Sequence, residues 1–292
     1  MNQDNIYLNS PVEKIEWNNY IDSQSAKPVS IYLQGNKKIL TDCVIVTSSL
    51  GFLKENHYSL FDPPLPKPYI IAIESLGFGM INKIFLDFDE PWWENNVRGF
   101  QFLWKTDNCE NNRSKDKLPS WVYDLTGFDV VYGHKAVLLG WIGGKGARII
   151  ETISEHQIIQ GCANLFRYFL KNDSVPEASK CMVSCWASNQ FVRGGYSHIS
   201  KNCDINGVSP ATLSEPIWAT SNTTGLKNVI HSIFFMINIL EKKIELCILK
   251  LQKRPILMLA GEATHDSYYS TTHGAYDTGV KQAQIFLKHV TK

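Results

Sequence analysis

A short, unbroken apolar segment near the end of the chain constrains the fold most. The segment Pro255–Ala260 contains only apolar residues and has the length of a strand buried on both faces. A loop rich in glycine, serine, threonine and tyrosine follows it, and a helix is expected from about His273 to His289. A strand, a loop and a helix in this order are the building unit of α/β domains, so we predict a mixed α/β (α+β) fold.

The first part of the chain also predicts strands. Residues 12–17 and 29–33 alternate between apolar and polar, whereas 43–47 is a short apolar run typical of a strand buried on both faces. Four prolines then fall within residues 63–68. Because proline fixes φ and lacks an N–H donor, we place a domain boundary at this stretch.

The middle of the chain predicts a sheet walled by aromatic residues. Its expected strands are 81–88, 101–104 and 137–142. Apolar residues then recur at spacings of three and four between 153 and 170, which indicates an amphipathic helix packed on that sheet. The glycine-rich stretch 143–146 lacks the spacing of a phosphate-binding loop, and we interpret it as a turn after a strand.

These patterns divide the chain into three parts. Residues 1–65 and 185–292 are expected to contribute to one domain, and 66–184 to form another. The segment 225–253 could pack as a helix or expose an apolar patch. Its longest apolar run, 229–240, is well short of the roughly 20 residues that a membrane-spanning helix needs.

Composition excludes several classes of protein. The 292 residues are 44% hydrophobic, which is normal for a globular chain with one large or two ordinary domains. The 29 basic and 28 acidic residues leave a net charge of +1 without long blocks of one sign, which argues against nucleic acid as a partner. The seven cysteines are scattered, so we expect free thiols in a reducing compartment. The first 20 residues do not have the pattern of a secretory signal.

The densest chemical signal directly follows the predicted strand at 255–260. It begins Gly261-Glu262-Ala263-Thr264-His265 and continues to Gly279. Glu262 is expected at the carboxyl end of the sheet, where a carboxylate can accept hydrogen bonds from ligand hydroxyls. A structural turn without a ligand is the alternative interpretation of this motif.

The same motif also predicts the start of a helix. Thr271 or Thr272 can cap it, and Gly274 and Ala275 are small enough to let a flat ring approach the backbone. The N-terminus of a helix carries a partial positive charge and therefore favours a ligand that gains negative charge.

Two further segments carry candidate residues. Lys83 lies within GFGMINKIFLDF, residues 77–88, which precedes Pro91-Trp92-Trp93. A lysine in a strand is usually solvated, but a buried lysine bonded to a water can transfer protons. Trp186 and Tyr196 lie within WASNQFVRGGYS. Such aromatic residues belong more often to a core, yet as walls of a site they exclude water and attract cationic amines by about a kcal/mol.

In this order, these segments resemble the flavin-containing amine oxidases of the polyamine oxidase type. Two shorter matches, residues 11–15 and 47–54, extend the resemblance over nearly the whole chain except residues 225–253. By this resemblance, residues 225–253 are interpreted as an atypical insertion. Gly195 departs from the pattern, since serine is usual there. The resemblance makes residues 1–65 and 185–292 parts of an FAD-binding domain and 66–184 a substrate-binding domain.

The resemblance also implies roles for individual residues. Lys83 matches the catalytic lysine, which in the family holds a water against the flavin. The cofactor-binding positions are Val12, Trp186, Tyr196, Gly261, Glu262, Thr271, Thr272, Gly274 and Ala275. The substrate-binding positions are Tyr196, Ser270 and Thr271. Because the loop 268–273 contains no cysteine for covalent attachment, we expect FAD to bind non-covalently.

The reaction implied is the oxidation of spermine or an N1-acetylated polyamine by hydride transfer to the flavin. Its products are an aminoaldehyde, an amine and, with molecular oxygen as electron acceptor, hydrogen peroxide. We expect a cytoplasmic enzyme. A peroxisomal location is the alternative, although the chain does not end in the Ser-Lys-Leu signal. The oligomeric state does not follow from the sequence.

One departure from the family favours a different interpretation. The chain contains no Gly-x-Gly-x-x-Gly turn, on which a dinucleotide-binding domain holds the pyrophosphate. A catalytically silent fragment that does not hold FAD alone is therefore the main alternative. A histone demethylase relative would share the flavin motifs but normally has extra helical domains. A hydrolase using Ser270 and His273 would lack the Gly-x-Ser-x-Gly elbow.

Overall fold

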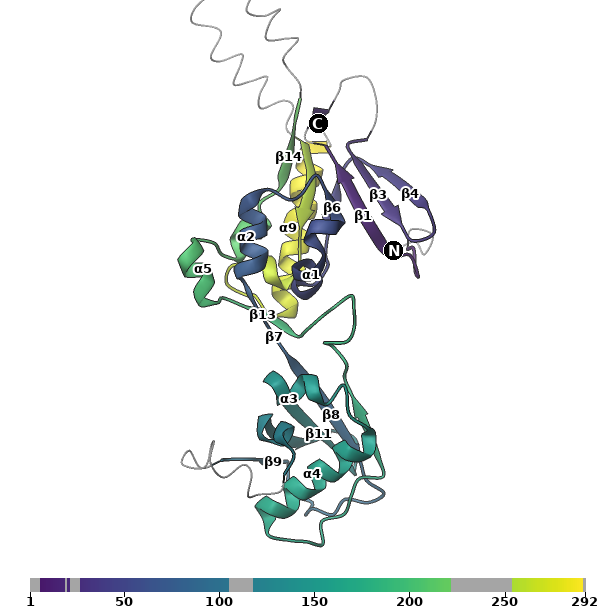
Figure 1. Ribbon diagram of the computed structural model, residues 1–292, viewed down its shortest axis with the longest axis vertical. Coiled ribbons are helices and arrows are strands. Elements are labelled where there is room, and N and C mark those ends of the chain that lie inside the picture. The colour runs from purple at the N-terminus through teal and green to yellow at the C-terminus, as the bar shows by residue number, and fades with distance from the viewer. Residues whose placement is uncertain (1–5, 19, 22–26, 105–117, 222–253, 291–292) are drawn as a thin grey trace, which may run out of the picture. The chain divides into compact units, whose positions relative to one another are not determined.

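The chain folds into two compact units that together contain both helices and sheets (Figure 1). The first unit comprises Met1–Gly77 and Ser197–Lys292, and the second comprises Phe78–Tyr196. The predicted mixed α/β class is confirmed. The computed structural model describes residues 6–18, 20–21, 27–104, 118–221 and 254–290. The expected insertion at 225–253 lies outside the described residues.

The first unit contains a four-stranded sheet in the order β4-β3-β1-β6. Its central pair, β1 and β3, is antiparallel, and β6 runs parallel to β1. The strands at 12–17 and 29–33 are therefore confirmed. The four strands are β1 (Val12–Trp17), β3 (Val29–Leu33), β4 (Lys37–Thr41) and β6 (Phe61–Asp62).

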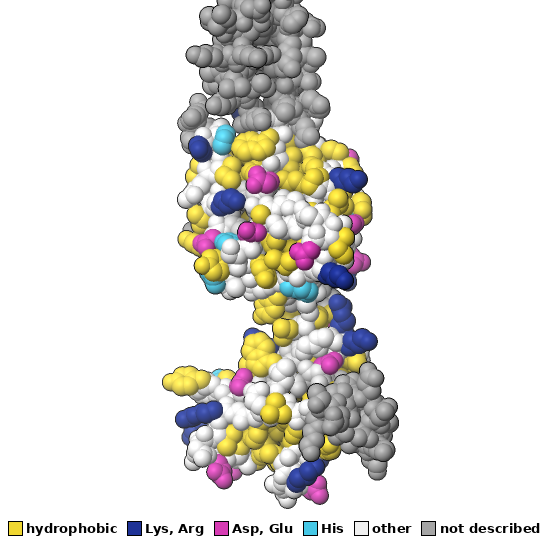
Figure 2. Space-filling view, turned by 90° about the vertical axis from the view of Figure 1, so that its left-hand side faces the viewer, with side chains coloured by type: hydrophobic (Ala, Val, Ile, Leu, Met, Phe, Trp, Pro, Cys, Tyr) yellow, Lys and Arg dark blue, Asp and Glu magenta, His cyan; other side chains and the backbone are white. Residues whose placement is uncertain are grey.

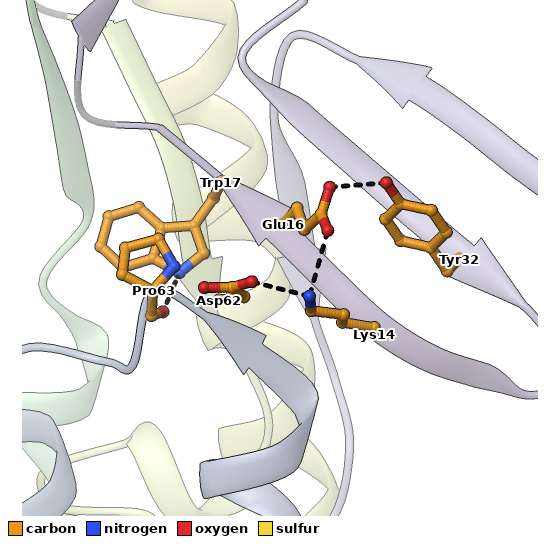
Figure 3. A network of polar contacts seen from close by, with 6 residues as sticks. All are labelled: Lys14, Glu16, Trp17, Tyr32, Asp62 and Pro63. Carbon is orange, nitrogen blue, oxygen red and sulfur yellow. Dashed lines mark hydrogen bonds and ion pairs between the residues drawn. The ribbon is translucent and has the colours of Figure 1, made fainter.

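Polar side chains join β1 to the strands on both of its sides, as Figure 3 shows. The Lys14 ammonium lies 3.1 Å from Glu16 Oε1 and 2.6 Å from Asp62 Oδ2 of β6. The Tyr32 hydroxyl of β3 donates to Glu16 Oε2 at 2.5 Å. β1, which carries the candidate Val12, is therefore fixed against two segments that are distant in sequence.

A second four-stranded sheet in the first unit has the order β2-β14-β15-β5. β15 is buried from Pro255 to Leu259, which confirms the apolar strand at 255–260. β5 pairs parallel to β15, but Ile45 is 36% exposed, so the expected burial of both faces is wrong for β5. The reason is that β5 is an edge strand of the sheet in the described part of the chain. The strands are β2 (Tyr20–Ile21), β5 (Val44–Val46), β14 (Ile217–Ser221) and β15 (Arg254–Leu259).

The long helix α9 (Thr272–Val290) packs on β15 and confirms the helix expected at the end of the chain. Its buried Gln282 side chain donates to the carbonyls of Ser214, at 2.7 Å, and Leu259, at 3.1 Å. These two bonds satisfy the Nε2 donors of the buried amide, whereas its Oε1 has no hydrogen-bond partner in the described part of the chain. α9 is therefore held to the end of β15, close to the segment with the densest motif.

The proline-rich stretch ends β6 and begins a helix. Pro66 is the N-cap of α2 and Pro68 lies in its first turn, where a missing N–H costs nothing. Lys54 of α1 donates to the carbonyl of Ile73 at 2.7 Å, which ties α1 to the end of α2. The compact units are divided after Gly77 and after Tyr196. The boundaries at 65 and 184 between an FAD-binding and a substrate-binding domain stay a prediction. The short helices here are α1 (Leu50–Leu60), α2 (Lys67–Ser75), α5 (Lys201–Asn206) and α6 (Pro210–Ser214).

The second unit is built on a five-stranded sheet in the order β12-β8-β11-β10-β9. Neighbouring strands are antiparallel. The strands expected at 81–88 and 137–142 are confirmed, whereas the one expected at 101–104 lies earlier and pairs with β10 only as far as Gln101. The strands are β8 (Ile81–Asp87), β9 (Gly99–Gln101), β10 (Leu125–Val130), β11 (Val137–Gly143) and β12 (Lys180–Val183).

Helix α4 (Glu155–Leu170) covers this sheet, as its spacing of apolar residues predicts. Ser154 and Gln157 form a capping box at its start. Phe166 of α4 and Phe128 of β10 are fully buried, with ring centroids 4.9 Å apart. Burial of each such side chain stabilises the fold by about 1.5–3 kcal/mol, so this cluster gives the unit its own core.

The glycine-rich stretch 143–146 does not form the expected turn. It begins the helix α3 (Gly144–Ile149), which packs on the 3-10 helix η3 (Ser120–Asp124). The Gly146 N–H donates to Asp124 Oδ2 at 2.7 Å, and a Cβ at Gly146 would lie 2.8 Å from the Trp121 carbonyl. The glycines therefore permit close packing of two short helices.

Charges of both signs are mixed on the face shown in Figure 2. Within the described ranges, no helix is long and apolar enough to cross a membrane. No group of three or more His, Cys, Asp or Glu side chains is arranged to hold a metal ion in that part of the chain. The cysteines among these residues are free thiols, while Cys109 and Cys247 lie outside them.

Candidate functional site

The loop after β15 begins with a glycine in an unusual conformation. Gly261 has φ +141°, which residues with a side chain rarely adopt, and a Cβ there would have no heavy atom within 4 Å. Its N–H donates to Thr278 Oγ1 of α9 at 3.0 Å, and its carbonyl accepts from Thr264 Oγ1 at 2.9 Å. Gly261 is thus fixed by α9 and by η4 (Glu262–Thr264), with open space beside its Cα.

Glu262 connects this loop to two other segments. Its Oε2 accepts from the Ser197 hydroxyl at 2.5 Å and from the Ser270 N–H at 2.6 Å. In the described part of the chain, its other oxygen, Oε1, has no donor from the protein. The half-buried carboxylate therefore bonds to the protein through one oxygen, and its other oxygen is an acceptor that the described protein does not use.

Ser270 completes this arrangement. It has φ +64°, a left-handed conformation that costs a residue with a side chain about a kcal/mol or more. Its N–H bonds to Glu262 Oε2, and its hydroxyl donates to the carbonyl of Ser197. Two hydrogen bonds therefore offset the backbone strain of Ser270 and fix the turn before α9.

The start of α9 is capped by Thr271, one of the two predicted caps. Thr271 Oγ1 accepts from the Gly274 N–H at 3.1 Å, and its carbonyl accepts from the Ala275 N–H at 3.1 Å. Within the described residues, the N–H groups of Thr272 and His273 have no acceptor from the protein. These two donors suit a ligand with an acceptor or a developing negative charge.

A glycine at position 274 is required by close packing of the loop before α9. A Cβ at this position would lie 2.0 Å from the Tyr268 carbonyl and 3.1 Å from Thr271 Oγ1. The position that a side chain would take at Gly274 is thus filled by the preceding loop, so close packing requires a glycine there, and the approach of a flat ring to its backbone stays a prediction. Gly261, rather than Gly274, has the open side.

In the second unit, Lys83 lies on β8 opposite Trp141 of β11. Its ammonium is 4.6 Å from the centroid of the Trp141 ring, and the residue is only half-exposed. Contact with the face of a tryptophan stabilises a cation by about 0.5–1 kcal/mol at such sites. Lys83 is therefore held against the sheet instead of extending freely into solvent.

Trp186 and Tyr196 are not core residues, because each is 44% exposed. Tyr196 begins β13 (Tyr196–His198), which pairs with β7 (Gly77–Gly79). Exposed aromatic side chains are available to a ligand, which is what the resemblance implies for both positions. Val12, the first residue of β1, is 39% exposed and pairs with Leu33.

The structure brings some of the predicted residues together and not others. In the first unit, Glu262 and Ser270 are bonded, and Thr271, Thr272, Gly274 and Ala275 follow in one turn. Val12 lies on another sheet of that unit. The candidates in the second unit are Lys83, Trp186 and Tyr196. Sequence reasoning assigned no role to Ser197, although the residue directly follows Tyr196 in the matched segment.

Comparisons with known proteins agree on one family. The sequence matches flavin containing amine oxidoreductases over residues 1–203 and 242–287. It is 29% identical over 291 residues to the human peroxisomal N(1)-acetyl-spermine/spermidine oxidase, covering 98% of this chain and 51% of that protein. It is also 29% identical over 306 residues to a probable polyamine oxidase of Arabidopsis thaliana, covering 97% of this chain and 51% of that protein.

A solved structure agrees at the level of the fold. Wild-type putrescine oxidase bound to putrescine superposes with a TM-score of 0.61 at 14% identity, covering 97% of this chain and 49% of that one. At this identity the likeness concerns the fold alone. The chain thus spans about half the length of the relatives that it matches.

Proposed function

Because the chain belongs to the family of flavin containing amine oxidoreductases, we propose that it serves in the FAD-dependent oxidation of polyamines. The substrate class that we infer is spermine or an N1-acetylated polyamine. Support comes from two relatives whose names specify acetylpolyamine or polyamine oxidation. Since the chain spans about half of those relatives, this activity is a proposal for the whole enzyme to which such a chain contributes.

The arrangement around Glu262 is the observation that carries this proposal. A half-buried carboxylate keeps one oxygen without a donor from the described protein, and the preceding residue, Gly261, has open space where a side chain would lie. The first-turn N–H groups of Thr272 and His273 are also without protein acceptors there. An acceptor for hydroxyl groups beside donors for an electron-rich ring fits the ribityl chain and ring of a non-covalently bound FAD.

When bound, FAD supplies the acceptor for the hydride that leaves the carbon next to the amine nitrogen. We assign the remaining tasks to side chains of this chain. Lys83 would hold or transfer a proton at Nζ, and Trp186 and Tyr196 would exclude water and attract the cationic amine. The Ser270 hydroxyl donates to Ser197, so its oxygen can still accept from a substrate ammonium.

The overall reaction needs only the polyamine, water and molecular oxygen as reactants. The substrate C–N bond is oxidised to an imine, and water hydrolyses the imine to an aminoaldehyde and an amine. Molecular oxygen takes up the two electrons and two protons as hydrogen peroxide. For the compartment we propose the cytoplasm. The human relative is named as peroxisomal, so fractionation of cells is the measurement that decides between the two.

A second candidate is a chain that does not hold FAD by itself. One observation favours it: the sequence contains no Gly-x-Gly-x-x-Gly turn for the pyrophosphate. In this case the residues of the Glu262 loop would serve FAD only together with a segment that supplies such a turn.

An anaerobic absorption experiment tests the proposal. The purified chain is incubated with FAD, freed of unbound flavin, and mixed with spermine or N1-acetylspermine. We expect the flavin absorbance at about 450 nm to fall as the cofactor is reduced, and hydrogen peroxide to form when air is admitted. The Lys83→Met variant should retain FAD but react at least about tenfold more slowly, since the proton-transfer group is removed. Retained flavin that no polyamine reduces would contradict the proposal, and absence of retained flavin would favour the second candidate.

A further inference from the structure

The second unit contains a fully buried amide, Asn82, directly before Lys83 in β8. Asn82 is 0% exposed, and its side chain lies on the face opposite to that of Lys83, because side chains alternate along a strand. Its Nδ2 donates to the Ala147 carbonyl at 2.8 Å and to Glu151 Oε1 at 2.6 Å. Both partners only accept hydrogen bonds, so they fix the orientation of the amide.

The oxygen of the same amide is also fully used. Asn82 Oδ1 accepts from the Ser184 hydroxyl at 3.0 Å and from the Trp186 N–H at 3.4 Å. An asparagine side chain offers two donors and two acceptor sites, and all four are occupied here. A buried polar group with this degree of satisfaction defines the positions of its partners, since loss of any one leaves an unpaired group in the core.

Glu151 extends the network to the residues that follow Trp186. Its Oε1 accepts from the Ala187 N–H at 2.9 Å, and its Oε2 accepts from the Ser188 N–H at 2.7 Å. Burial acts to raise the pKa of Glu151, but the hydrogen bonds from Asn82, Ala187 and Ser188 outweigh it and leave the pKa below its ordinary value. Asn82 and Glu151 together hold three successive backbone N–H groups, those of residues 186–188.

Ser184 connects the network to Lys83. The regular β12–β8 pairing ends where Val183 faces Ile84. Beyond that point the Ser184 N–H donates to the Lys83 carbonyl at 3.0 Å, and the Lys83 N–H donates to Ser184 Oγ at 2.8 Å. The hydroxyl takes the place of a strand carbonyl, and it donates in turn to Asn82.

We propose that Asn82 and Glu151 are positioning residues that set Lys83 and the Trp186 turn relative to one another. Lys83 lies on β8, whereas Trp186 lies in the turn that follows β12, about a hundred residues later in the chain. One buried amide nevertheless contacts the backbone of the Trp186 turn and, through Ser184, the backbone of Lys83. The roles of Lys83 and Trp186 rest on the proposed function, whereas the network that places them does not.

Two variants of the full chain, Glu151→Gln and Ser184→Ala, test the proposal. Glu151→Gln keeps the size of the side chain but replaces one acceptor oxygen by a donor, so amide exchange at 186–188 should accelerate about tenfold. Ser184→Ala removes the hydroxyl that accepts from the Lys83 N–H and donates to Asn82, so acetylation of the Lys83 ammonium should accelerate about twofold relative to Lys180 on the same sheet. Exchange is followed by mass spectrometry on peptides, and acetylation by mass spectrometry after brief treatment with acetic anhydride.

Glu155→Gln is the matched control. Glu155 Oε1 accepts from the Cys181 N–H at 2.6 Å, so it too holds a backbone N–H of β12, but it does not contact Asn82. It should leave exchange at 186–188 and the acetylation of Lys83 unchanged. The proposal would be overturned by equal acceleration across all peptides of the second unit in Glu151→Gln, or by unchanged acetylation of Lys83 in Ser184→Ala. Neither readout requires FAD, so failure of the chain to retain flavin would count against the proposed function and not against this inference.

Discussion

Two glutamates, one in each unit, hold a loop that carries candidate residues, but they do so with different numbers of oxygens. Glu262 in the first unit uses Oε2 for Ser197 and Ser270 and leaves Oε1 without a donor from the described protein. Glu151 in the second unit uses both oxygens, for Asn82 and for two backbone N–H groups. Both glutamates are half-buried; Glu262 begins η4, and Glu151 lies just after α3.

This difference separates two uses of a carboxylate. A glutamate that uses both oxygens within the protein, as Glu151 does, has fewer acceptor sites left for a ligand, so its main contribution is to position other groups. A glutamate with one oxygen to spare can position a loop and bind a ligand hydroxyl as well. The number of unused acceptor sites distinguishes the two cases, although both residues lie near candidate site residues.

The largest expected effect comes from removing the carboxylate of Glu151. In Glu151→Leu, Asn82 and two backbone N–H groups lose their acceptor, which should lower the free energy of unfolding of the second unit by about 3 kcal/mol. Urea unfolding followed by amide exchange in peptides of residues 78–196 measures this loss. A loss below about 1 kcal/mol would remove the contrast between the two glutamates.

A smaller effect is expected for Glu262→Gln. The amide retains one acceptor oxygen, so the loop loses only part of its hydrogen bonding, and the free energy of unfolding of the first unit should fall by about 1 kcal/mol. Amide exchange of Ser270 should accelerate locally. The matched control is Glu177→Gln, an exposed glutamate of the second unit, which should change neither quantity.

Removing the cap of α9 should have a similar or slightly smaller effect. Thr271→Ala leaves the Gly274 N–H without its acceptor and should destabilise the first unit by about 0.5–1 kcal/mol. Thr271→Ser, which keeps a hydroxyl, should restore most of this stability in thermal unfolding. If Thr271→Ala were as stable as the wild type, the hydrogen bond would not define the start of the helix.

The two units should also lose stability at different pH values, and protonation of a single group is expected to have the smallest effect on the free energy of unfolding. His57 in α1 is 2% exposed, and burial lowers its pKa from 6.5, opposed by the carboxylate of Glu74 and assisted by Lys54. The unfolded chain therefore takes up a proton before the folded one, so the first unit should lose stability as the pH falls below about 6.5.

The matching carboxylate in the second unit titrates at lower pH. The pKa of Glu151 is lowered from 4.5, so its contribution is present above that value and is lost as the pH falls through the folded pKa. Amide exchange measured at about pH 7, 5.5 and 4 should show that the first unit begins to lose stability at a higher pH than the second unit. His57→Phe should remove the early loss, and its persistence would assign the loss to other groups.

Much of the fold could be predicted because its signals are local. The apolar run at 255–260 became β15, and the three- and four-residue spacing between 153 and 170 became α4. The glycine-rich stretch 143–146 was misread because its structure depends on contacts with η3, where Asp124 and Trp121 approach Gly146. No local pattern in the sequence contains that information.

The candidate residues were found by motif, but their supporting contacts were not. Asn82 appears in the sequence as an ordinary polar position in a strand, and its partner Glu151 is 69 residues away. Ser197 and Glu262 are separated by 65 residues. Such pairs form only when the chain has folded, so composition and periodicity do not reveal them. The open side of Gly261 and the filled side of Gly274 likewise depend on the path of the loop between them.

The most direct test of the division between the two glutamates is an FAD titration of the full chain, followed by quenching of flavin fluorescence. The wild-type chain should bind FAD, and Glu262→Gln should weaken binding about tenfold because a hydroxyl acceptor is lost. Glu177→Gln should bind FAD like the wild type. Equal affinity of Glu262→Gln and the wild type would contradict the claim that Glu262 keeps one oxygen for the cofactor, whereas no binding by the wild type would favour the second candidate, in which the chain does not hold FAD by itself.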